Sequence, residues 1–216
     1  MIRDGGIQTS VNYPRQLAVA LLIGALAGLG AKLADEWTVS WLGNLGSNRP
    51  LWIVITVIIG WKAARPALAA AWSACFFMAM VAAYYSLTVF VLGYPVNASS
   101  ALWLIEAITI VPALSAITAA VRGRTVAEPV WIGLCAALIL VEGGPRRAWF
   151  SLTGQMPYDV DWIVVGAIET AFAIGLLLLV ARSQRRLAAA AIICVVSVWP
   201  LSVLIDRIFS VIRFSY

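Results

Sequence analysis

Histidine is absent from this chain of 216 residues, and cysteine occurs only three times. Cys75, Cys135 and Cys194 each lie inside an apolar stretch, far from one another in the sequence. This pattern argues against disulfide bonds, a zinc site and haem-type ligation, and it is typical of small buried side chains. The chain also lacks a Walker motif, a nucleophile elbow and an HExxH motif. We therefore expect neither a metal site nor a cofactor.

Charged residues are scarce as well. They make up 12% of the chain, whereas hydrophobic residues make up 62% and the mean hydropathy is +0.94. A soluble domain of this length cannot bury so much apolar surface, so the composition predicts a lipid bilayer as the surroundings. Long continuous apolar stretches favour helices over a barrel, because backbone groups in lipid must be bonded internally. The net charge of +5 is ordinary for a membrane protein, and we expect no nucleic-acid partner.

Seven apolar segments predict an all-α polytopic membrane helix bundle, with residues 1–216 forming a single transmembrane domain. The expected spans are Leu17–Ala34, Leu51–Ala64, Ala67–Leu92, Ala101–Val121, Val130–Val141, Trp162–Ala181 and Leu187–Ile212. The second and fifth are short for the ~20 residues that a span needs, which predicts tilt, local thinning or burial inside the bundle. Pro112 and Pro200 predict kinks within their spans. Ala20, Gly24 and Gly28 predict close packing of the first span against another helix.

The basic residues predict the orientation. Nine of the 15 fall on one side of this map and six on the other. The positive-inside rule then predicts a multi-pass protein of the inner (plasma) membrane with a cytoplasmic N-terminus. Eight of the ten acidic residues fall toward the outer face: Asp35, Glu36, Glu106, Glu142, Asp159, Asp161, Glu169 and Asp206.

Four of these acids, Glu106, Glu142, Glu169 and Asp206, lie in or at the edge of a span. An ionisable group at membrane depth costs roughly 2.5–3.5 kcal/mol on insertion scales, so it is usually kept for a purpose. Glu106 and Glu169 have no basic residue within a turn of their own helices, which makes them the strongest functional candidates. Asp206, in contrast, has possible ion-pair partners in Arg207, Arg146 and Arg147, and Asp35 and Glu36 have the alternative role of capping the first span.

Helical spacing places an aromatic residue on the same face as each of these four acids. The pairs are Trp103 with Glu106, Trp131 with Glu142, Trp162 with Glu169, and Trp199 with Asp206. Tyr84 and Tyr85 add two phenols at similar depth. We expect an interior lined by aromatic faces and carboxyl groups. Interfacial anchoring is the ordinary role for tryptophan at helix ends. It is the main interpretation for Trp37, Trp41, Trp52 and Trp149, and an equal alternative for Trp103 and Trp162.

Such a lining is typical of chemistry on a carbocation. Indole and phenol faces stabilise positive charge, a neutral carboxyl group donates the starting proton, and a carboxylate removes one. Ionisation of a diphosphate requires clustered aspartates and magnesium. Asp159-Val160-Asp161 is only a DxD pattern at the edge of a loop, where acids at a helix start are the ordinary explanation.

The chain resembles a family of small multi-pass actinobacterial membrane proteins of unknown function. The matching features lie mainly in residues 15–145: the opening Leu21–Leu26 run, Asn48 before the Trp52 span, the Tyr84-Tyr85 pair, Trp103 and Glu142. More loosely, the chain is similar to the integral-membrane terpene cyclases of fungal meroterpenoid and bacterial indole-terpenoid pathways. Those are small seven-span enzymes with acids in the bundle, one of them in the last span. The resemblance implies that Asp206 matches the last-span acid and that Glu106 or Glu169 matches the other.

Three functions are therefore considered. The first is a membrane-embedded terpene cyclase that acts on a hydrophobic, prenylated small molecule. Its catalytic residues would be Asp206, Glu106, Glu169 and Glu142, and its substrate-binding residues Tyr84, Tyr85, Trp103, Trp162 and Trp199. The second is a small-molecule or ion transporter, or the substrate-binding subunit of one, that uses the intramembrane carboxylates. The third is a scaffold without a small-molecule site, in which the carboxylates pair with arginines rather than line a void.

Overall fold

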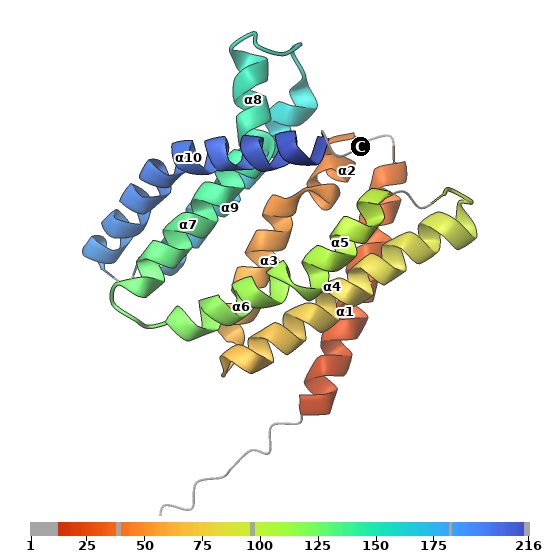
Figure 1. Cartoon of the computed structure of the whole chain (residues 1–216), viewed down its shortest axis with the longest axis horizontal. Helices are drawn as coiled ribbons and strands as arrows, with labels where there is room; N and C mark the ends of the chain where they lie inside the picture. Colours follow the sequence, from red (N-terminus) through yellow and green to blue (C-terminus); the bar gives the residue numbers. More distant parts are fainter. Residues whose placement is uncertain (1–12, 38–39, 96–97, 182, 214–216) are drawn as a thin grey trace, which may run out of the picture.

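Helices make up all the regular structure that the computed structural model describes, which covers residues 13–37, 40–95, 98–181 and 183–213 (Figure 1). The expected all-α fold is therefore confirmed. The helices in chain order are α1 (Tyr13–Glu36), α2 (Ser40–Ser47), α3 (Arg49–Lys62), α4 (Pro66–Ser86), the π-helix η1 (Leu87–Val91), α5 (Ala98–Ile108), α6 (Ile110–Val121), α7 (Ala127–Glu142), α8 (Gly144–Leu152), α9 (Val160–Leu179) and α10 (Gln184–Arg213).

Each of the seven predicted spans is helical, although not all are long enough to cross a bilayer. Within the described residues, five segments have the length and hydropathy of a span: Tyr13–Glu36, Pro66–Val91, Ser100–Val121, Val160–Leu179 and Gln184–Arg207. A sixth results if α7 and α8, which are bent by 47° relative to each other, form one broken span. The remaining predicted span is α3, which has only 14 residues. The multi-pass membrane fold is thus confirmed.

The short helix α3 lies at the centre of the bundle. On one side it packs against α4 and α6, and on the other against α7 and α9. Its consecutive residues Trp52 and Ile53 serve different cores. Trp52 belongs to the cluster of α4, α5 and α6 residues that includes Phe77, whereas Ile53 joins Ile132 in a second cluster. Of the three explanations for the short second span, burial inside the bundle is the one that these contacts support.

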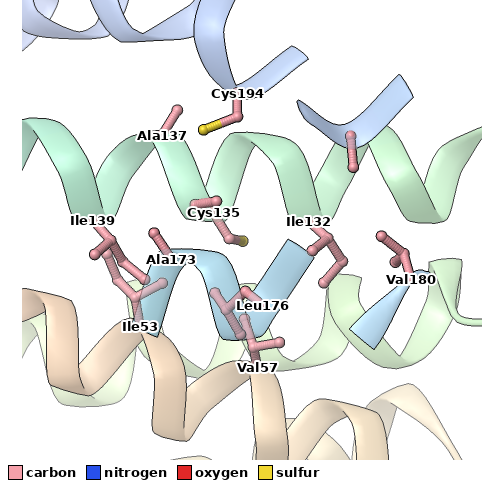
Figure 2. Packing of buried hydrophobic residues seen from close by; sticks show 12 residues of the cluster. Ile53, Val57, Ile132, Cys135, Ala137, Ile139, Ala173, Leu176, Val180 and Cys194 are labelled. Carbon is pink, nitrogen blue, oxygen red and sulfur yellow. The ribbon is translucent and has the colours of Figure 1, made fainter. Parts of the chain in front are cut away.

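The second cluster is built from α3, α7, α9 and α10, whose side chains interdigitate in Figure 2. Cys135 and Cys194 lie within it and are 1% and 3% exposed. Both thiols are free, and so is that of Cys75. Cys135 and Cys194 therefore act as small buried side chains, as expected.

Glycine allows α1 and α4 to pack backbone to backbone. A Cβ atom at Gly24 would collide with the main chain of Phe76, and one at Gly28 would collide with that of Met80. The small-residue face of the first span is therefore used inside the chain, which confirms the predicted close packing.

Proline interrupts the fourth span where the sequence predicts it. The helix breaks at Thr109 between α5 and α6, three residues before Pro112. Proline has no N–H to bond the carbonyl group four residues earlier, here that of Ile108, and its ring clashes with that group. Pro200 lies within α10, which follows α7 and then turns to run across the end of the bundle (Figure 1).

The eight acids predicted to share one face do gather at one end of the bundle, here called the carboxylate end. Contacts between distant segments show this: Tyr84 of α4 bonds Asp35, Ser40 of α2 bonds Asp161, and Arg49 of α3 contacts Glu106 and Glu142. Glu128 lies at the opposite end, paired with Arg186. Asp4 lies outside the described residues.

Candidate functional site

A cavity of about 630 Å³ opens at the carboxylate end. Its wall is formed by the start of α3, Trp103 of α5, the junction of α7 and α8, and residues near the end of α10. Its charged lining comprises three guanidinium groups and two carboxylates: Arg49, Arg146, Arg147, Glu142 and Asp206. We call it the arginine–carboxylate cavity.

Arg49, the first residue of α3, bridges two of the predicted catalytic acids. Its Nε and Nη2 atoms donate to Glu106 at 2.9 to 3.3 Å, and its Nη1 atom lies 3.5 Å from Glu142. The guanidinium carbon also lies 5.1 Å from the centroid of the Trp103 ring. Trp103 and Glu106 thus face the same cation, as their spacing of three residues predicts. Glu106 therefore has a cationic partner, which the sequence of its own helix does not show because Arg49 lies on another helix.

Asp206 forms the second ion pair of the cavity. Two nitrogens of Arg146 donate to its two carboxylate oxygens at 3.0 and 2.8 Å, so the contact is bidentate and joins α8 to α10. This is one of the partners that the sequence left open for Asp206. A bidentate contact stabilises the carboxylate as an anion.

Glu169 is fully buried and does not line the cavity. It accepts a hydrogen bond from the Gly144 N–H at 2.5 Å and another from the Asn48 amide at 3.3 Å. Gly144 begins α8, so the carboxylate of α9 satisfies an N–H group that would otherwise have no helical partner. A Cβ atom at Gly143 would collide with this carboxylate. Glu169 therefore fixes the junction of α7 and α8, which forms one wall of the cavity.

Aromatic side chains form a separate, smaller pocket of about 70 Å³. Trp52, Tyr84, Tyr85 and Trp103 line it, together with Ala31, Gly46, Met80 and Val81. The rings of Trp52 and Trp103 are 4.7 Å apart between centroids. Trp103 lines both this aromatic pocket and the arginine–carboxylate cavity. Trp52 is only 7% exposed, so its interpretation as an interfacial anchor is wrong: packing against α4 and α5 buries it.

The other two predicted aromatic residues occupy different places. Trp162 lines a third cavity, of about 380 Å³, and stacks against Arg147. Trp199 is 75% exposed and lines none of these three cavities, which corrects the expectation that it shapes the interior. Its helix contacts mainly α7, and the described residues leave most of the Trp199 side chain uncovered.

Asp159 and Asp161 are used at the start of α9. Asp159 caps the helix by accepting the Asp161 N–H at 2.9 Å, and Asp161 accepts a hydrogen bond from Ser40. The interpretation of the DxD pattern as a helix start is confirmed. In the part of the chain that the structure describes, no three His, Cys, Asp or Glu side chains are grouped to hold a metal ion.

The site residues that sequence reasoning missed are mostly cations. From the sequence, Arg49 served only to orient the chain in the membrane, and Arg146 and Arg147 were otherwise named only as possible partners of Asp206, although an arginine next to an apolar span was the available signal. Lys32 is a further example. It is 6% exposed, forms an i,i+4 pair with Glu36 at 2.6 Å, and lies 5.3 Å from the ring centroids of Tyr84 and Tyr94.

Comparison with known families adds one finding. The family of unknown function DUF6518 matches residues 8–210. The chain belongs to this family. No curated protein and no solved structure matches it. The helices and apolar spans of this DUF6518 member fit a multi-pass membrane protein of unknown function, whereas no finding supports the looser resemblance to terpene cyclases.

The DUF6518 site combines two features that the sequence set against each other. Its carboxylates pair with arginines, as a scaffold predicts, and two of them, Glu142 and Asp206, also line a void. The volume of about 630 Å³ lies within the roughly 300–1,000 Å³ of small-molecule sites. The arrangement has room for a ligand and presents donors, acceptors and an aromatic face to it.

Proposed function

We propose that this protein binds a prenylated small molecule across Trp103 and cyclises it by protonating a carbon–carbon double bond. The observation that carries the proposal is that Trp103 lines both the arginine–carboxylate cavity and the aromatic pocket. A molecule lying across this ring has its polar part beside charged groups and part of its unsaturated chain beside indole and phenol faces. The small aromatic pocket accommodates only a segment of such a chain.

Glu142 is the acid best placed to supply the proton. It lines the cavity, and its single contact with Arg49 is 3.5 Å long. Glu106 accepts three hydrogen bonds from the same guanidinium, and Asp206 is held by both nitrogens of Arg146. These two carboxylates are thus held by several charged hydrogen bonds each, which suits them to stabilise a developing positive charge. Asp206 also lines the cavity, where it can accept a proton.

The proposed reaction is a net isomerisation. The Glu142 carboxyl group gives its proton to one carbon of a double bond, and the neighbouring carbon becomes a cation. A second double bond supplies the electron pair that closes the ring, and a proton lost to the Asp206 carboxylate ends the sequence. Proton exchange with water then restores both groups. Aromatic faces such as that of Trp103 contribute roughly 0.5–2 kcal/mol to each cation that they contact.

Glu169 is a positioning residue in this scheme. It is buried beneath Gly143 and holds the start of α8, which carries Arg146. Its replacement is therefore expected to reduce turnover by shifting the cavity wall rather than by removing the proton.

The test uses purified protein in lipid nanodiscs with farnesylated and geranylgeranylated indole as substrates. An isomeric product that gains a single deuterium in D₂O is expected. Glu142→Gln should abolish it, whereas Trp199→Ala, a matched tryptophan variant away from the cavities, should leave the rate unchanged. Absence of an isomer from both substrates, or full activity of Glu142→Gln, would overturn the proposal.

A transporter is the second candidate, and buried polar groups between the two ends favour it. Thr56 of α3 and Ser115 of α6 are fully buried, and their hydroxyls have no partner among the described residues. Beyond them lies Glu128, fully buried and 3.5 Å from Arg186. Proton flux into proteoliposomes that Glu128→Gln removes would support this candidate. A proton flux into the proteoliposomes that is no larger than the flux into protein-free vesicles would refute it.

A further inference from the structure

Arg147 lies between two cavities at the carboxylate end. It lines the arginine–carboxylate cavity of about 630 Å³ and also the third cavity, of about 380 Å³, which lies against the start of α9. Met156 is the other residue that the two linings share. A group bound at Arg147 is therefore accessible from either space.

The other two arginines of the cavity form ion pairs with carboxylates at 2.8 to 3.5 Å, whereas Arg147 interacts with the Glu142 and Glu169 carboxylates only at longer range. Among the described residues, no carboxylate oxygen lies within 4 Å of its guanidinium group, and no side chain or backbone group accepts a hydrogen bond from it. Its partner is instead the Trp162 ring, whose centroid is 4.1 Å from the guanidinium carbon. An aromatic contact of this kind holds the cation in place and uses none of its five N–H donors.

We infer that Arg147, held by Trp162, recognises the phosphate group of an amphiphilic ligand. A guanidinium fork matches the geometry of a phosphate and donates two parallel hydrogen bonds to it. This inference rests on the proposed function and narrows its preferred substrate to a prenylated molecule that carries a phosphate ester, which should bind more tightly than phosphate-free prenylated molecules. The phosphate would lie at Arg147 while the chain extends toward Trp103, which lines the same cavity.

The position of Arg147 suits this ligand. Trp149 and Tyr158 are 63% and 71% exposed on the neighbouring segments, as is typical of aromatic residues at the head-group level of a bilayer. The carboxylates of this region have other close contacts: Glu142 contacts Arg49, Asp206 binds Arg146, Glu169 accepts the Gly144 N–H group, and Asp159 accepts the Asp161 N–H group. Of the three described arginines that line the cavity, Arg147 is therefore the one whose donors are available to an added anion.

The experiment measures binding to the full-length protein in phosphatidylcholine nanodiscs by isothermal titration. Farnesyl phosphate is expected to bind more tightly than farnesol. Arg147→Gln should weaken the binding of farnesyl phosphate about tenfold to a hundredfold, because one charged contact is lost, and should leave the binding of farnesol unchanged. Arg147→Lys should lie between the two, since it keeps the charge without the fork. Arg65→Gln, at the opposite end, is the matched control and should bind like the wild type.

Two further arms identify the source of the phosphate. If phosphatidylglycerol in the nanodisc displaces farnesyl phosphate in an Arg147-dependent way, a lipid head group is the natural ligand, and the narrowing of the substrate is overturned. If inorganic phosphate competes at similar concentrations, a free anion is the ligand, with the same consequence. Equal binding of farnesol and farnesyl phosphate, or wild-type affinity of a correctly folded Arg147→Gln, would overturn the phosphate site itself.

The binding readout keeps this inference separate from the proposed function. Arg147-dependent binding of farnesyl phosphate without any isomeric product would refute the cyclase and leave the phosphate site standing. Isomeric product from the prenylated indoles, together with farnesyl phosphate binding that does not depend on Arg147, would support the cyclase and refute the phosphate site.

Discussion

Replacing Arg49 tests whether the cavity wall depends on a shared cation. Arg49 lies 2.9 Å from Glu106 and 3.5 Å from Glu142, and the three side chains are 32%, 20% and 17% exposed. Removing one partner from a fully buried pair costs about 3–5 kcal/mol, whereas an exposed pair contributes about 0–1 kcal/mol. These partly exposed groups lie between the two limits. We therefore expect Arg49→Gln to lower the free energy of unfolding by about 2 kcal/mol.

The assay is thermal unfolding in a mild detergent, followed by intrinsic fluorescence. For a chain of this length, about 2 kcal/mol corresponds to a drop in Tm of about 4–8 °C. Adding Glu106→Gln to the Arg49→Gln protein removes one of the two unpaired carboxylates, so it should restore about 1 kcal/mol. Arg65→Gln, at the exposed opposite end, should change stability by less than about 0.5 kcal/mol.

Two results would refute this reasoning. One is an Arg49→Gln protein with the Tm of the wild type, because the carboxylates would then need no cation. The other is a Glu106→Gln substitution that lowers the Tm equally in the wild type and in Arg49→Gln, because independent effects show no coupling between the two side chains.

The remaining predictions concern packing and the cavity walls. Gly24→Ala should destabilise the protein by about 1–3 kcal/mol, because its Cβ meets the Phe76 backbone. Gly30→Ala on the same helix, with no atom within 4 Å of its Cβ, should leave the Tm unchanged or raise it. Glu169→Ala should cost about 1–2 kcal/mol and speed hydrogen exchange at the start of α8, unless another group bonds the Gly144 N–H. Trp103→Ala should weaken binding of prenylated ligands in titrations where Trp199→Ala does not, and equal losses would contradict the cavity assignment.

Much of the fold was predictable because the length of an apolar segment is a local property. All seven expected segments are helices, and the break near Pro112 and the packing of Gly24 follow from the chemistry of single residues. The short helices α2 and α8 were not expected. Each has fewer than ten residues, and such helices form only because longer neighbours pack against them.

The candidate site was predictable only in its residue types and in the end of the bundle at which they lie. Spacing along one helix placed Trp103 with Glu106, yet it gave no indication that Arg49, 57 positions earlier, holds that carboxylate. Spacing along one helix likewise gave no indication of the role of Glu169, because its partners Gly144 and Asn48 are 25 and 121 positions away. Spacing along one helix also made Trp199 a plausible interior residue, although the described helices leave it exposed.

The sequence by itself determined that this protein is an all-helical, multi-pass membrane protein with eight of its ten acids gathered at one end. Hydropathy and the scarcity of charge determine whether a segment prefers lipid or water. That preference does not depend on which helices pack against each other. Only the tertiary structure decided which acids are paired, which line a void, and which cation has no carboxylate partner among the described residues. Those properties depend on contacts between helices far apart in the chain, and the central position of α3, which brings Arg49 to both Glu106 and Glu142, creates them.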